Sequence, residues 1–213
     1  MKLLPVLPLL ALAPGLRAAP LERDLGQGLT YWRAHAIPED LPATLAHRPC
    51  VLDVRYVHGG GEQGAELLAW LRTHAGPHAP VFLLANSDTS GALLSPLNSP
   101  DSVIGLVIIG PRTKDFEPDI GVKEKAEEER KAYEALEHGA SVDSLITRRV
   151  DKVRNDEATL EKARADENGD DGDGADERKP AAAAKPAPAQ LIDVSLQRAV
   201  QLDRALLALR RLP

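Results

Sequence analysis

The stretch CVLDVRYVHGGG, residues 50–61, decides the fold prediction because it joins an apolar run to a charged pair and three consecutive glycines. Val51 and Leu52 belong to a run that is typical of a buried strand. Asp53 and Arg55 follow directly and mark where that strand ends. Glycines permit a tight turn or a close backbone approach, so the stretch predicts a strand that ends in a loop.

The segments on either side extend this pattern. A helix is expected over 62–75, where apolar residues recur at helical spacing. Short apolar runs predict further strands at 28–34, 80–86 and 103–110; the last has no polar alternation, as in a sheet covered on both faces. Strands that alternate with helices indicate an α/β layered domain with largely parallel pairing. We assign 20–139 to this domain.

Beyond the third apolar run the chain becomes helical and polar. A charged helix is expected over 123–139 and another over 140–166. Residues 167–189 are acidic and glycine-rich and then rich in Pro and Ala, which predicts a disordered linker. The final segment, 190–213, predicts an amphipathic helix that buries its stripe against the domain or against a second copy, which would give a homo-oligomer. The stripe consists of Ile192, Leu196, Ala199, Leu202, Leu206 and Leu209.

The first residues have the plan of a secretory signal peptide, expected over 1–19. Lys2 precedes an apolar stretch over 3–13, and a Pro-Gly break and small residues follow. The alternative is an apolar N-terminal strand or tail. The stretch is shorter than the roughly 20 residues that a membrane span needs, so no stable span is expected. We therefore expect an exported protein, either periplasmic or secreted.

Composition excludes some classes of function. The net charge of −6 argues against nucleic acid as a partner, because phosphates require a basic surface. A single cysteine, Cys50, allows no internal disulfide, and the six histidines show no spacing typical of metal ligands. We expect neither a metal nor a cofactor. Aromatic residues make up only 3% of the chain, so Leu, Val, Ile and Ala must form the core.

The order of these motifs resembles the catalytic core of the tail-specific (C-terminal-processing) serine proteases, which belong to the ClpP/crotonase superfamily. The resemblance covers about 27–138 and implies a crotonase-like layered sheet with flanking helices, here followed by a C-terminal helical extension. We expect no counterpart of the family's PDZ domain. The matching segments are GLTYWRA (28–34), VLDVRYVHGG (51–60), PVFLLANSDTSGA (80–92), LVIIGPRT (106–113), FEPDIGV (116–122) and AYEAL (132–136).

The resemblance gives the glycine loop a role. Gly59 and Gly60 stand where the family forms its oxyanion hole, in which backbone N–H groups stabilise the developing charge of an acyl-transfer transition state. The alternative is a tight strand-to-helix turn, which also favours glycine. Asp53 and Arg55 are expected to be structural at this site, because Arg can bond loop carbonyls and Asp can accept from loop N–H groups or from the Arg.

The catalytic pair departs from the family's pattern. Gly91 occupies the position of the nucleophilic serine, and Phe116 occupies that of the lysine base. Ser90 lies one position before Gly91, and Lys114 lies two positions before Phe116. Asp115 follows Lys114 directly. A neighbouring carboxylate raises the pKa of a lysine, whereas a lysine base needs a lowered one. No residue is therefore assigned as catalytic, and Ser90 with Lys114 is the alternative pair.

Three hypotheses follow. The first is a non-catalytic binding or scaffold protein whose inherited cleft binds a peptide or protein partner. The second is an active serine peptidase or hydrolase that uses Ser90 and Lys114. The third is an interaction protein that acts through its C-terminal helices. Fold alone does not choose among them, because function depends on the site.

Overall fold

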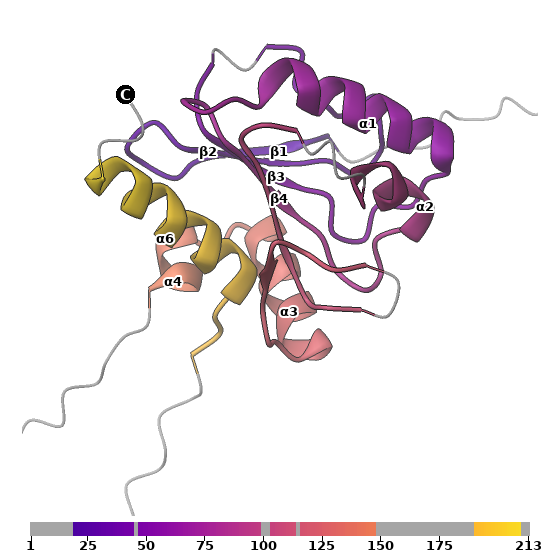
Figure 1. Cartoon of the computed structure of the whole chain (residues 1–213). Coiled ribbons are helices and arrows are strands. Elements are labelled where there is room, and N and C mark those ends of the chain that lie inside the picture. The colour runs from indigo at the N-terminus through magenta and orange to yellow at the C-terminus, as the bar shows by residue number, and fades with distance from the viewer. Residues whose placement is uncertain (1–18, 45–46, 99–102, 114–115, 148–189, 210–213) are drawn as a thin grey trace, which may run out of the picture.

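The computed structural model describes residues 19–44, 47–98, 103–113, 116–147 and 190–209. Their centre is a six-stranded mixed sheet with helices on both faces (Figure 1). The order of strands in the sheet equals their order along the chain. The strands are β1 (Leu21–Asp24), β2 (Thr30–Arg33), β3 (Cys50–Asp53), β4 (Val81–Leu84), β5 (Leu106–Gly110) and β6 (Ile120–Gly121).

The pairing is parallel from β2 to β6, and only β1 runs antiparallel to its neighbour. Leu52 of β3 pairs with Trp32 of β2 and with Leu83 of β4. All four residues of β3 and of β4 are buried, as expected for central strands that are covered on both faces. Because the strands are parallel, the loops that follow β2 to β6 all emerge at one edge of the sheet.

One face of the sheet is covered by α1 (Gly61–His74), α2 (Gly91–Leu94) and the 3-10 turn η1 (Ser95–Asn98). Helix α1 begins where the glycine loop ends, and Leu67 and Leu71, one turn apart, lie on its buried side. They pack with Leu52 and Leu83, the residues of the central strands that point to this face. This layer gives α1 its orientation relative to the glycine loop.

The opposite face is covered by α3 (Ala126–Glu137), α4 (Val142–Ile146) and α6 (Val194–Ala208). Val51, Phe82 and Leu84 point to this face and pack with Leu136 of α3 and Leu196 of α6. Two apolar cores thus lie on either side of one sheet. In the described residues no helix is long and apolar enough to cross a membrane.

The C-terminal helix packs on its own domain. Asp193 caps α6 by accepting from the Leu196 backbone N–H at 2.9 Å. Leu196 and Ala199 are fully buried, Leu202 and Leu206 are half-buried against the same core, and Leu209 is 69% exposed. The predicted stripe is therefore buried over its first turns and emerges from the domain at its end.

The α/β class and the helices on both faces agree with the sequence-based expectation. The strands expected over 28–34, 80–86 and 103–110 are present as β2, β4 and β5, each shorter than its apolar run. The strands β1 and β6 were not predicted. Helix α4 ends at Ile146, so the part of the predicted 140–166 helix from 148 onward lies outside the described residues, as do 1–18 and the linker expected over 167–189.

Candidate functional site

The glycine loop and the segment that follows β4 lie together at the carboxyl edge of the sheet. The Ser90 backbone N–H donates to the carbonyl of Val57 at 3.0 Å, and Ser90 Oγ donates to the carbonyl of Gly59 at 2.6 Å. Thr89 Oγ1 donates to the carbonyl of Val54 at 3.1 Å. Three bonds therefore hold the Ser90 segment against the loop that the sequence resemblance assigns to an oxyanion hole.

The donors of this loop are partly used within it. The Gly60 N–H donates to Gln63 Oε1 at 2.9 Å, which caps the start of α1. An oxyanion hole needs backbone donors that point at the substrate, and a donor that is already bonded to a side chain is not available. At Gly59 a Cβ atom would lie 3.2 Å from the Cβ of Gln63, so this glycine permits close packing against the helix start. Both glycines thus have a structural role in the turn.

The two positions that align with the family's catalytic serine and lysine, Gly91 and Phe116, carry no reactive group. Gly91 is the first residue of α2, and a Cβ atom placed there would meet nothing within 4 Å. Phe116 is half-buried and packs against the core on the α1 face. Lys114 lies outside the described residues. In the described part of the chain, the Ser90 hydroxyl has the Gly59 carbonyl as its hydrogen-bond acceptor, and no His, Lys or carboxylate is bonded to it.

The single cysteine of the chain does not supply a nucleophile either. Cys50 lies at the start of β3 and is fully buried. Burial raises the pKa of its thiol to about 12, so the reactive thiolate is not populated near neutral pH. Over the described ranges, no group of His, Cys, Asp and Glu side chains is arranged to hold a metal ion.

Asp53 and Arg55 belong to a buried cluster of charges, the Arg55 cluster, which comprises Arg33, Asp53, Arg55, Glu129 and Asp193. Arg55 donates to Asp53 through Nε at 3.0 Å and through Nη2 at 2.7 Å. It also forms a bidentate pair with Asp193, at 3.1 and 2.8 Å. The side chains of Arg55 and both aspartates are 0% exposed. Arg55 therefore bonds carboxylates from β3 and from the cap of α6, not the loop carbonyls suggested by the sequence.

The rest of the cluster surrounds this pair. Tyr31 donates to Asp53 Oδ2 at 2.6 Å, and Arg33 Nε donates to the Tyr31 oxygen at 2.9 Å. Glu129 Oε1 lies 3.9 Å from Arg55 Nη1. Burial opposes ionisation of Asp53, but the positive charge of Arg55 and its hydrogen bonds outweigh burial and lower the pKa of Asp53. Buried charges of this kind are tolerated only when they are paired and hydrogen-bonded.

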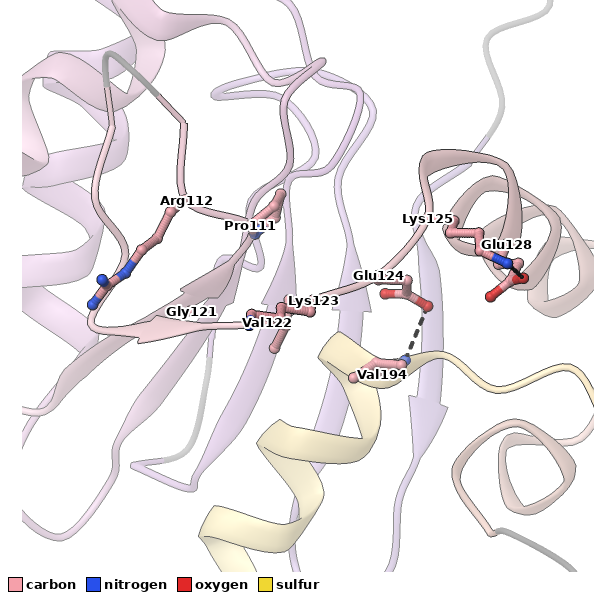
Figure 2. A pocket seen from close by; sticks show the side chains of 9 residues that line it. All are labelled: Pro111, Arg112, Gly121, Val122, Lys123, Glu124, Lys125, Glu128 and Val194. Atoms are coloured by element: carbon pink, nitrogen blue, oxygen red, sulfur yellow. Dashed lines mark hydrogen bonds and ion pairs between the residues drawn. The ribbon is translucent and has the colours of Figure 1, made fainter.

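A cleft opens at the carboxyl ends of β5 and β6. We call it the Glu124 cleft. Figure 2 shows its lining residues, which come from the loops after both strands, from the start of α3 and from the first residue of α6. Its volume is about 840 Å³, within the range of small-molecule sites. The lining consists of Pro111, Arg112, Gly121, Val122, Lys123, Glu124, Lys125, Glu128 and Val194.

Glu124 is the one half-buried residue among the charged residues that line this cleft; the others are exposed. Its Oε1 accepts from the Val194 backbone N–H at 3.2 Å, the contact drawn as a dashed line in Figure 2. Its Oε2 is buried and has no hydrogen-bond partner. Burial, with the nearby charge of Asp193, raises the pKa of Glu124 to about 7. A carboxyl group with this pKa exchanges a proton near neutral pH, as binding and catalytic groups often do.

Sequence reasoning missed the Glu124 cleft and its connection to α6. The only available signal was the placement of basic residues around Glu124 after an apolar run, and that pattern also fits an exposed helix start. No family model matches this chain, and no curated protein matches its sequence.

Proposed function

We propose that this is an exported, non-catalytic binding protein whose core derives from a crotonase-like domain of the tail-specific protease type. The order of the motifs supports this origin, because each matching segment falls on a strand, on a loop at the carboxyl edge or on the helix α3 that follows. The sequential, mostly parallel sheet is compatible with such a core. We expect such a domain, without its nucleophile, to bind a peptide or protein partner or to act as a scaffold.

The observation that carries the proposal is the state of the residues at the nucleophile position. Gly91 offers no side chain for attack, and the neighbouring Ser90 hydroxyl donates its proton to a backbone carbonyl. A serine becomes a nucleophile when a base accepts its proton, and a carbonyl oxygen is not such a base. The Gly60 N–H is also occupied by Gln63. Nucleophile and part of the oxyanion hole are both missing.

The test is covalent labelling with a fluorophosphonate probe, together with an assay of unfolded polypeptide cleavage. We expect neither labelling nor cleavage in the unmodified protein. The matched control is Ser90→Ala, which should behave like the parent chain. Labelling that is abolished both by Ser90→Ala and by Lys114→Ala would overturn the proposal and establish the second hypothesis, an active serine hydrolase with a displaced pair.

A reconstruction separates loss of the nucleophile from loss of the fold. Gly91→Ser introduces a side chain where the structure has open space, so the variant should fold with an unchanged melting temperature. Without a base it should remain unlabelled, and Phe116→Lys in the same chain supplies the missing family residue. Labelling that needs both substitutions would support a common architecture with the tail-specific proteases.

The third hypothesis, recruitment of partners by the C-terminal helices, has less support. The apolar stripe of α6 is used on its own sheet through Leu196 and Ala199, and a helix whose stripe is already buried has little apolar surface to offer. Leu209 is the exposed exception.

Export is part of the proposal. Strand β1 begins at Leu21, which pairs with Arg33, so cleavage near residue 19 would leave the whole strand in the mature protein. N-terminal sequencing of the protein recovered after secretion should give a first residue between Ala18 and Leu21. A mature chain that begins at Met1 or Lys2 would remove this part of the proposal.

A further inference from the structure

We propose that the Glu124 cleft is the ligand site of this protein and that it takes a carboxylate, from a free organic acid or from an acidic peptide. The inference rests on the proposed binding function but places the ligand away from the glycine loop. It names a site, a ligand chemistry and the residues that recognise it.

The charge of the lining is the first argument. The chain as a whole carries a net charge of −6, yet the three cations that line this cleft, Arg112, Lys123 and Lys125, outnumber its two carboxyl groups, Glu124 and Glu128. In Figure 2, Arg112 and Lys125 lie toward opposite ends of the lining, with Lys123 and Glu124 between them. A local excess of positive charge on an acidic protein attracts anions and holds them at the concave surface.

The cations are available to a ligand. Arg112 pairs with Glu117 at 3.2 Å and Lys125 with Glu128 at 3.0 Å, but all four side chains are more than half exposed. Exposed pairs contribute little and are exchanged readily for a better partner. Lys123 is exposed and makes no ion pair with the described residues. The Arg112 guanidinium offers two parallel N–H groups, which match the two oxygens of a carboxylate.

The second argument is the orphaned oxygen of Glu124. Oε2 is buried without a partner, and such atoms are rare because they lose their hydrogen bonds to water without replacement. When Glu124 is protonated, this oxygen no longer carries an unsolvated negative charge, and the cleft loses a charge that would repel a carboxylate. The first N–H of α6, on Val194, is already bonded to Oε1. A phosphate, which favours free N–H groups at a helix start, has less to bind here than a carboxylate.

The charges around Glu124 make the site sensitive to pH. Asp193 on α6 and Glu129 on α3 favour its protonated form, whereas Arg55 beyond β3 and the Val194 N–H favour its ionised form. The adjacent cations Lys123 and Lys125 are exposed to solvent. Burial and the two carboxylates prevail over the opposing groups. Protonation removes a negative charge from the cleft, so carboxylate affinity should rise as the pH falls through about 7.

The experiment measures binding of succinate, of a blocked triglutamate peptide and of inorganic phosphate to the full chain by calorimetry and by NMR, at pH 6 and pH 8. Uncharged succinamide is the ligand control. Succinate, the peptide or both should bind more tightly at pH 6, and the stronger of the two identifies the source of the carboxylate. Phosphate should bind more weakly than either.

Three variants test the residues. Lys123→Ala should weaken carboxylate binding by about tenfold, the usual scale for one charge-assisted hydrogen bond. Lys131→Ala is the matched control, since it removes the same charge from an exposed position on α3 outside the cleft, and it should have no effect. Glu124→Gln should abolish the difference between pH 6 and pH 8 while binding persists.

Several results would overturn the assignment. These are the absence of binding by both carboxylates at millimolar concentration, equal loss in Lys123→Ala and Lys131→Ala, an unchanged pH difference in Glu124→Gln, or tighter binding of phosphate or succinamide than of carboxylates. None of them restores a nucleophile, so the labelling assay tests the non-catalytic function separately. Conversely, fluorophosphonate labelling would end that function and leave the calorimetry to be interpreted as substrate binding.

Discussion

Asp193→Ala, at the cap of α6, should destabilise the protein strongly. The substitution removes both hydrogen bonds from Arg55 to Asp193, at 3.1 and 2.8 Å, and the helix cap at Leu196. Arg55 then remains fully buried with Asp53 as its closest partner. Breaking a buried ion pair by removal of one partner costs about 3–5 kcal/mol, and a lost N-cap about 1 kcal/mol, which overlaps with the first term.

The assay is urea unfolding followed by circular dichroism. With a dependence on urea of about 2 kcal/mol per molar, a loss of about 3–5 kcal/mol lowers the midpoint by about 1.5–2.5 M. A total stability of about 5–15 kcal/mol makes this a large fraction of the whole, so Asp193→Ala should be only partly folded at 37 °C if the parent is at the low end.

Asp203→Ala is the matched control because it removes the same side chain from the same helix. Asp203 is also buried, at 2% exposure, but its Oδ1 has no hydrogen-bond partner, and burial raises the pKa of its carboxyl group. Removing an unpartnered buried acid should leave the midpoint unchanged or raise it. The reasoning is refuted if Asp193→Ala shifts the midpoint by less than about 0.5 M, or if both variants lose the same stability.

Three further predictions concern other parts of the fold. The folded-state pKa of Glu124, about 7, lies above its ordinary value of 4.5. The contribution of Glu124 to stability is therefore complete below pH 4.5 and is lost as the pH rises through about 7. Urea midpoints at pH 5 and pH 8 should differ less in Glu124→Gln than in the parent. Gly110→Ala should prevent folding or lower the melting temperature strongly, because a Cβ atom at Gly110 would lie 2.2 Å from the Ala85 carbonyl oxygen; soluble yield and melting temperature measure this, and a parent-like variant would contradict the β4–β5 approach. Leu202→Asp should lower the melting temperature, because it places a charge against the half-buried side of α6; if the melting temperature and the size in solution both stay unchanged, the helix does not depend on that contact.

Local patterns predicted the parallel centre of the fold. Val51 and Leu52 precede a charged pair and a glycine loop, and such a sequence has few alternatives to a buried strand that ends in a turn. The helix expected over 62–75 agrees with α1, Gly61–His74, to within one residue at each end, although its buried side is formed by Gly64, Leu67 and Leu71 and Ala65 of the expected apolar spacing is exposed. The edge strands were missed for the opposite reason: β1 (LERD) is mostly exposed and β6 has two residues, so neither needs a hydrophobic pattern.

The site was harder to predict because its partners are distant in sequence. Asp53 was expected to accept from loop N–H groups or from Arg55, and it does accept from Arg55. The additional partner of Arg55, however, is the cap of a helix 138 positions away. The periodicity of apolar residues in the sequence gives no signal for such a long-range contact. Glu124 looked like one of several charges at a helix start, and only its burial beside Asp193 and Val194 distinguishes it from its neighbours.

The pairing of Arg55 with Asp193 also determines when the domain can complete its folding during synthesis. Because the chain is synthesised from its N-terminus, β2 to β6 are made well before Asp193. Until Asp193 has been synthesised, Arg55 lacks one of its buried hydrogen-bond acceptors. During that interval the face of the sheet that α6 covers remains open to water, and Arg55 has Asp53 but lacks its second carboxylate partner, Asp193. Contacts between such distant positions form slowly because the intervening chain must first be closed into a loop. We therefore expect the domain to finish folding only after Asp193 and α6 have emerged from the ribosome, and nascent chains truncated before Asp193 should remain sensitive to protease.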